Sequence, residues 1–254
     1  MIIILSPSKT LSKIDINFSV NSSQPYFIDQ SEVIVKRMRS LSTADLKGLM
    51  GISQSLASLN YERFIKWQKP FNLSNSHPAL LTFKGDVYEG LSVDDFTKKD
   101  FEFAQNHLRI LSGLYGVLRP LDLMQPYRLE MGTKIDIGDN ENLYQLWQDR
   151  LTEYFNKELS KSKDKVLINL ASNEYSKAIR LKKLDGKVIT PVFKEQKGDH
   201  FKTIAIYAKR ARGLMSRFAI KKGITNVEQL KSFNDEGYIF SSNLSKEDQL
   251  VYIR

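Results

Sequence analysis

The sequence predicts one compact α/β domain over residues 1–254, with a mixed β-sheet flanked by helices. Hydrophobic residues make up 41% of the 254 positions, which is enough for a sizeable core. Stretches with strand and helix periodicity are mixed along the chain, and neither repeats nor an obvious linker separates them. The regular βαβα alternation of a doubly wound parallel sheet is missing, so the sheet is expected to be mixed.

In the first half of the chain, each expected element follows from its apolar spacing. Met1–Leu5 is an apolar run that predicts a buried strand. Ser42 and Asp45 form a capping arrangement at the start of a short helix to Met50. Ala79–Phe83 is predicted to be a strand that ends at Lys84-Gly85-Asp86. Apolar residues at helical spacing predict three further helices, over Asp29–Leu41, Ser53–Trp67 and Lys98–Leu111.

The second half is predicted in the same way. Leu143–Leu159 is an amphipathic helix, and Ala211–Lys221 is a short basic helix that Gly223 ends. A strand over Lys165–Leu170 is followed by a turn and a helix start at Glu174. The other expected strands are a hairpin of Lys187–Phe193 and Phe201–Lys209 with a loop longer than two residues, then Tyr238–Ser241 and Leu250–Ile253.

Composition excludes several classes of site. The chain has no cysteine, so disulfides, thiolate metal sites, iron–sulfur clusters and thiol redox sensing are ruled out. Its three histidines, His77, His107 and His200, are far apart in sequence and show no ligand spacing, so no metal site or cofactor is expected. No apolar run approaches the ~20 residues that span a bilayer. The first residues resemble a strand more than a signal peptide, and a cytoplasmic protein without a membrane partner is expected.

The net charge of +9 is unevenly distributed. Between Lys161 and Lys222 there are 17 lysines and arginines against five acidic residues, a surplus of twelve. A basic surface of this kind favours polyanions, with nucleic acid first, although a solvated face that only aids solubility has the same composition.

The segment Ile110–Met131 is the most unusual part of the chain. It places Arg119, Asp122, Arg128 and Glu130 among leucines, together with glycines and prolines that would disrupt a core helix. Charges held near a core need partners, either one another or a ligand.

Four other segments accompany the central one, namely Leu5–Leu11, Phe83–Tyr88, Asn169–Tyr175 and Tyr207–Phe218. Through these five segments the chain resembles, essentially from end to end, the YaaA family of bacterial proteins. The resemblance implies a single α/β domain and a role in resisting peroxide stress by keeping free intracellular iron low. It also implies DNA binding, and it implies no established reaction.

Two interpretations of Gly113 and Gly116 remain open. In a helix-hairpin-helix, their backbone amides would meet a DNA phosphate. However, two residues separate these glycines where that motif has one, and Pro120 follows closely. The alternative is a helix C-cap at Gly113 followed by a strand or turn.

Ionic residues at the ends of predicted elements form a second candidate site. Polar side chains at strand ends commonly meet in a cleft, where lysines and arginines bind phosphate or carboxylate. The alternative is an internal network of ion pairs. The residues proposed for a cleft are Lys9, Lys84, Arg119, Arg128 and Glu130, with Asp86, Tyr88, Asn173, Glu174 and Tyr175 nearby.

The basic helix near the C-terminus is a third candidate. Arg210, Arg212, Arg217 and Lys221 could follow a phosphate backbone, and Arg212, beside Gly213, is expected to be partly buried. A solvated face is the simpler interpretation.

Familiar catalytic and nucleotide motifs are absent, which favours a protein that is not an enzyme. The leading hypothesis is a peroxide-stress protein that binds double-stranded DNA non-specifically through phosphates and helps to lower free iron. The alternative is an enzyme that acts on a small anionic or phosphorylated substrate in the cleft.

Overall fold

The computed structural model describes residues 1–18 and 20–254, and in this part of the chain the main sheet has eight strands. Its central strands are parallel, in the order β12-β9-β8-β1-β5, while β11, β6 and β10 pair antiparallel at the edges. The sheet is therefore mixed, as the missing βαβα alternation predicted. The strands of this sheet are β1 (Ile2–Leu5), β5 (Leu108–Ser112), β6 (Gly116–Leu118), β8 (Val166–Asn169), β9 (Lys187–Lys197), β10 (His200–Lys202), β11 (Ile239–Phe240) and β12 (Gln249–Ile253).

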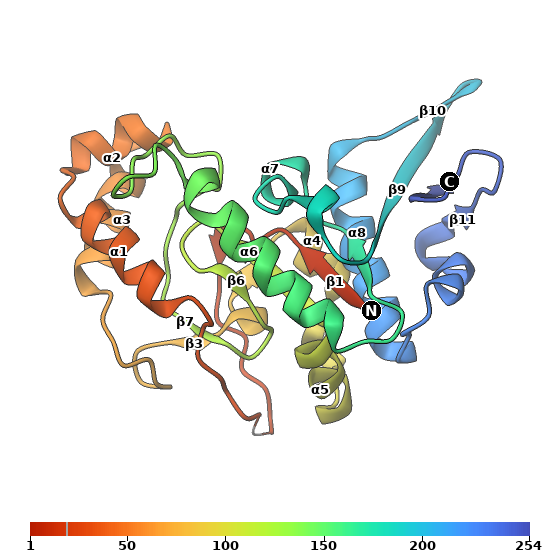
Figure 1. Cartoon of the computed structure of the whole chain (residues 1–254), viewed down its shortest axis with the longest axis horizontal. Coiled ribbons are helices and arrows are strands. Elements are labelled where there is room, and N and C mark those ends of the chain that lie inside the picture. The colour runs from red at the N-terminus through yellow and green to blue at the C-terminus, as the bar shows by residue number, and fades with distance from the viewer. Residues whose placement is uncertain (19) are drawn as a thin grey trace.

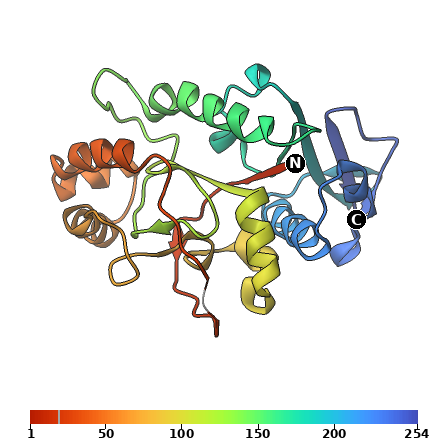
Figure 2. The same ribbon diagram turned by 60° about the horizontal axis from the view of Figure 1, so that its bottom comes forward.

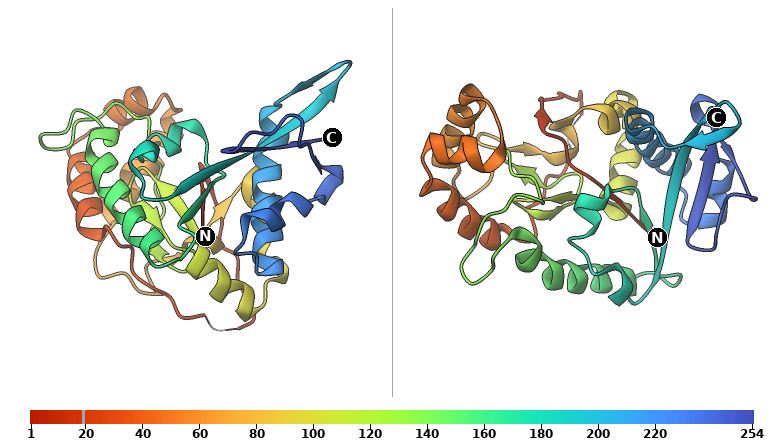
Figure 3. Two further views of the ribbon diagram at one scale, coloured as in Figure 1. Left: turned by 45° about the vertical axis from the view of Figure 1, so that its right-hand side comes forward. Right: turned by 90° about the horizontal axis from the view of Figure 1, so that it is seen from above.

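Helices cover both faces of this sheet. Helix α6 lies on one face, and α4, α5 and α8 lie on the other (Figures 2 and 3). Helices α1–α3 group at one end of the molecule, and the β9–β10 hairpin projects from the opposite end (Figure 1). The α-helices are α1 (Ile28–Arg39), α2 (Thr43–Met50), α3 (Gln54–Lys66), α4 (Asp86–Leu91), α5 (Lys98–His107), α6 (Leu143–Ser160), α7 (Asn173–Ser176) and α8 (Ala205–Lys222).

Short elements complete the fold. Two small antiparallel pairs join β2 (Thr10–Leu11) to β4 (Phe83–Lys84) and β3 (His77–Pro78) to β7 (Leu123–Met124). The 3-10 turns cover Ala79–Leu81, Val93–Asp95, Leu181–Lys183, Val227–Ser232 and Asp235–Gly237.

Most predicted elements are confirmed within a few residues, but four predictions were wrong. The helix predicted over Lys98–Leu111 ends at His107, because the next residues pair in parallel with β1, with Leu108 opposite Ile3. Ala79–Phe83 is mainly a buried 3-10 turn, since a short apolar run fits either structure. The strand predicted over Phe201–Lys209 stops at Lys202, and α8 begins at Ala205. The preceding hairpin loop has two residues, Gly198 and Asp199, rather than more.

The helix-hairpin-helix interpretation is also wrong. Gly113 lies in the buried turn that follows β5, and Gly116 is the first residue of β6, so a strand rather than a second helix follows the turn. A Cβ at Gly113 would lie 2.4 Å from the Leu129 carbonyl oxygen, and one at Gly116 would lie 2.7 Å from the Trp147 ring. Both glycines therefore permit close packing, and their amides are not presented to a DNA phosphate.

Candidate functional site

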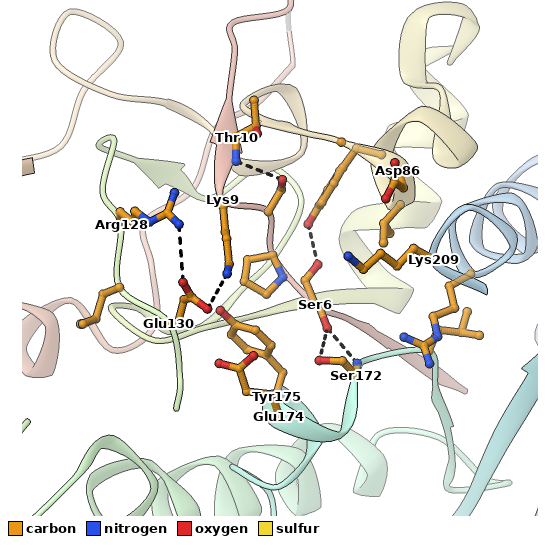
Figure 4. Close-up of a pocket in the computed structure, with 18 of the residues that line it drawn as sticks. Ser6, Lys9, Thr10, Asp86, Arg128, Glu130, Ser172, Glu174, Tyr175 and Lys209 are labelled. Atoms are coloured by element: carbon orange, nitrogen blue, oxygen red, sulfur yellow. Dashed lines mark hydrogen bonds and ion pairs between the residues drawn. The ribbon is translucent and has the colours of Figure 1, made fainter. Parts of the chain in front are cut away.

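A pocket of about 500 Å³ opens where β1 and β8 end. The two strands are parallel neighbours, so the segments that follow them leave the sheet at the same edge. The Ser172 amide donates to the Ser6 hydroxyl at 2.8 Å, and the Tyr88 hydroxyl donates to the Ser6 carbonyl at 3.0 Å. These contacts hold three distant segments together as the pocket floor (Figure 4).

One wall of the pocket carries the Glu130 cluster, which we define as Lys9, Arg128 and Glu130 (Figure 4). The Lys9 ammonium lies 2.8 Å from one carboxylate oxygen of Glu130. An Arg128 guanidinium nitrogen lies 3.7 Å from the other oxygen, which is longer than a hydrogen bond. Arg128 Nε is buried and has no hydrogen-bond partner in the described residues. Glu130 therefore forms a close ion pair with Lys9, whereas the Arg128 guanidinium keeps hydrogen-bond donors that Glu130 does not bind.

The opposite wall carries Lys209 and Arg212 from α8. They are three positions apart along the helix, so both face the same side. No carboxylate in residues 1–18 or 20–254 lies within ion-pair distance of either side chain, although Asp86 also lines this wall. Burial lowers the pKa of the Arg212 guanidinium from its ordinary value, so holding its charge there costs free energy. An anion in the pocket would offset that cost.

Two glycines place α8 against the pocket. A Cβ at Gly213 would lie 1.8 Å from the Val87 carbonyl oxygen, and one at Gly90 would lie 2.2 Å from the Arg210 carbonyl oxygen. Helices α4 and α8 therefore meet backbone to backbone. This contact fixes Asp86, at the start of α4, on the same wall as Lys209 and Arg212.

Tyrosines and Glu174 complete the lining. Burial raises the pKa of the Tyr88, Tyr127 and Tyr175 phenols, so these hydroxyls stay neutral hydrogen-bonding groups. A Glu174 carboxylate oxygen accepts from the Gly132 amide at 3.0 Å, which ties the segment after β8 to the one after Glu130. The remaining lining residues are Pro7, Ser8, Thr10, Gly85, Val87, Leu129 and Leu170.

Two residues predicted for the cleft lie outside it. Lys84 pairs with Thr10 in the β2–β4 ladder, and its side chain is exposed beyond the pocket lining. Arg119 binds the buried Asp122 carboxylate at 2.9 Å, in a separate turn. Of the five candidates, the fold brings together Lys9, Arg128 and Glu130.

The predicted DNA-contacting cations divide into two groups. Arg212 faces the pocket, whereas Arg210, Arg217 and Lys221 form ion pairs within the fold. Arg210 binds Glu236 at 2.7 Å, Arg217 binds Asp95 at 2.5 Å, and Lys221 binds Asp100 at 3.1 Å. Carboxylates of the protein itself therefore partly neutralise these three positive charges.

The sequence analysis missed the pocket role of Lys209, Ser6 and Ser172. The sequence places Lys209 at the end of the predicted strand Phe201–Lys209, although its spacings of three positions from Arg212 and of four from Gly213 are available signals. A glycine inside a helix often has a packing reason, and Lys209, four positions before Gly213, lies on the same face of the helix. Ser6 and Ser172 follow strands, but serines at strand ends are too common to single out.

A protein-family model described as "Peroxide stress protein YaaA" matches residues 1–244, which include every pocket residue. The chain belongs to the peroxide stress protein YaaA family. This membership confirms the resemblance and the assignment to peroxide stress. In this YaaA-family chain, no group of three or more His, Cys, Asp or Glu side chains within the described residues is arranged to hold a metal ion. None of the helices in residues 1–18 and 20–254 combines the length and apolarity that crossing a membrane requires.

Proposed function

We propose that this peroxide stress protein binds a small anionic or phosphorylated ligand in the pocket, and that protection from peroxide depends on this ligand. The observation that carries the proposal is the pair of cations on α8, Lys209 and Arg212, which face the pocket without a carboxylate partner among the described residues. Two converging donors of this kind suit a phosphate or carboxylate group.

The Glu130 cluster would then meet the rest of the ligand. Its carboxylate is held by Lys9, and its side chain is about one-quarter exposed toward the pocket. A carboxylate in that position can accept a proton from a bound ligand, and the neutral Tyr175 hydroxyl can donate a hydrogen bond nearby. The pocket therefore contains groups for chemistry as well as for binding. We propose that the lowering of free iron implied by the family follows from this ligand.

The pocket proposal is tested by Arg212→Gln, with Arg210→Gln as the matched control. Both variants remove one guanidinium from α8, but the Arg210 side chain pairs with Glu236 outside the pocket. Arg212→Gln should abolish peroxide survival in a strain that lacks the native protein, while the melting temperature stays the same or rises because an unpaired charge is removed. Arg210→Gln should cost only ~0–1 kcal/mol of stability and keep protection. Full protection by a folded Arg212→Gln protein would contradict the proposal.

DNA binding is a second candidate function, favoured by the projecting β9–β10 hairpin (Figures 1 and 3). Lys194, Lys197 and Lys202 lie on this hairpin, and none has an ion-pair partner in the part of the chain that the structure describes. We propose that these lysines contact the phosphates of double-stranded DNA without reading its sequence.

Replacing Lys194, Lys197 and Lys202 together with alanine should weaken duplex binding. Each lost phosphate contact weakens the salt dependence of binding. The negative slope of log affinity against log salt should therefore become shallower by about 3. Gel-shift titrations at several salt concentrations measure this slope. The control removes three exposed lysines elsewhere, Lys47, Lys99 and Lys157. Equal changes in both triple variants would show that the hairpin has no special role.

A further inference from the structure

A second hollow of about 220 Å³ lies next to the pocket, and we call it the groove. Two chain segments line both. Residues 6–10 and 127–130 line the pocket, while residues 11–13, Met124 and Pro126 line the groove. The shared wall is held in place by backbone hydrogen bonds, from the Ser12 amide to the Thr82 carbonyl at 2.8 Å and from the Ile14 amide to the Leu81 carbonyl at 2.9 Å.

The groove differs from the pocket in the charge of its lining. Three carboxylates line the pocket, but the groove lining contains the cations Lys13 and Arg63 and no acidic residue within the described chain. Lys13 is exposed, and the Ser12 hydroxyl lies beside it at the rim. Any ligand group that settles there meets positive charge and hydrogen-bond donors.

Arg63 is the central cation of the groove. It projects from α3, is partly buried, and makes one side-chain hydrogen bond, from Nη1 to the Asn60 side-chain oxygen at 3.2 Å. No carboxylate in residues 1–18 and 20–254 lies within ion-pair distance of it. Burial, and secondly repulsion from Arg128, lower the pKa of the Arg63 guanidinium. Arg63 and Arg128 therefore repel each other across the wall between groove and pocket, and an anion between or beside them would relieve the repulsion.

We propose that the groove is a second phosphate-binding subsite beside the pocket, so that the ligand of this protein reaches across the shared wall and carries at least two phosphate groups. The proposal rests on the proposed function of the pocket, because one phosphate is assigned to Lys209 and Arg212 and the other to Lys13 and Arg63. A guanidinium group can donate two parallel hydrogen bonds to two oxygens of one phosphate group. A single carboxylate oxygen could accept only part of that pair. A free nucleotide with two separate phosphates and a single nucleic-acid strand share this chemistry.

Calorimetric titration of the full chain with three probes tests the subsite. The probes are adenosine 5′-monophosphate, adenosine 3′,5′-bisphosphate and a short single-stranded oligothymidylate. Arg63→Gln should weaken the bisphosphate or the oligothymidylate about tenfold or more and leave the monophosphate unchanged. Lys13→Ala, at an exposed position where folding is not at risk, should act in the same direction. Lys66→Ala is the control, since it removes a cation from α3 that pairs with Glu62 outside the groove.

Each outcome has a distinct meaning. Loss of bisphosphate binding supports the subsite and assigns a free nucleotide-like ligand, whereas loss of the oligothymidylate alone supports it and assigns a nucleic-acid strand. If Arg63→Gln and Lys13→Ala bind both two-phosphate probes as tightly as the unaltered chain does, the subsite is overturned. It is also overturned if these variants weaken the monophosphate as much as the two-phosphate probes. If Arg63→Gln weakens binding but Arg212→Gln does not, the subsite stands and the pocket proposal fails. If no probe binds the unaltered chain, both are overturned.

Discussion

Replacing Gly213 with alanine is expected to lower the melting temperature by about 4–8 °C, because the added Cβ would lie 1.8 Å from the Val87 carbonyl oxygen. The atom in the way belongs to the backbone of α4, so the two helices must move apart. Alanine would gain about 1 kcal/mol over glycine in a helix interior. The overpacking cost should reach about 3 kcal/mol or more, and the clash therefore wins.

Gly48→Ala is the matched control for this prediction. Gly48 lies within α2, and a Cβ there would have nothing within 4 Å. The same substitution should therefore raise stability by up to about 1 kcal/mol. Thermal unfolding of both variants, followed by circular dichroism, makes the comparison. A Gly213→Ala protein that melts with the unaltered chain would show that α4 and α8 are not held together at this glycine.

Removing the Arg128 side chain is expected to abolish protection from peroxide while the melting temperature stays within a few degrees. Arg128 is 18% exposed, its Nε has no partner in the described residues, and its nearest carboxylate oxygen is 3.7 Å away. Its loss leaves Glu130 bound to Lys9 at 2.8 Å, so no buried carboxylate loses its only partner. Removing it also ends the repulsion of Arg63. We therefore expect the loss of Arg128 to affect ligand binding more than folding.

Lys84→Ala is the comparison, because Lys84 is exposed and lies outside the pocket. It should leave both stability and peroxide survival unchanged. If Arg128 belonged to a structural network instead, Arg128→Ala would cost roughly 3–5 kcal/mol and the protein would melt early. If Arg128 were an isolated surface charge, the variant would be stable and fully protective. Melting temperature and survival, measured together, distinguish the three cases.

The elements that could be predicted from the sequence are those with strong local signals. Helix α2 is capped by Ser42, whose side chain and that of Asp45 form the expected capping box. The amphipathic pattern of Leu143–Leu159 corresponds to α6 within one residue. The end of α5 was missed because Leu108 and Leu111 continue the helical spacing, and only pairing with β1, more than a hundred residues earlier, turns them into a strand.

The candidate site divides in the same way. The sequence by itself determined that Arg128 and Glu130 lie near apolar residues and need partners, and that the basic charge is concentrated between Lys161 and Lys222. Only the tertiary structure decided which of these cations form ion pairs within the described residues. Arg217 binds Asp95 and Lys221 binds Asp100 across more than a hundred residues, while Lys209 and Arg212 are turned to the pocket by the glycine contact of α4 and α8. The physical reason is range: caps and apolar periodicity act within a few residues, whereas ion pairs and strand pairing join parts of the chain that no local pattern relates.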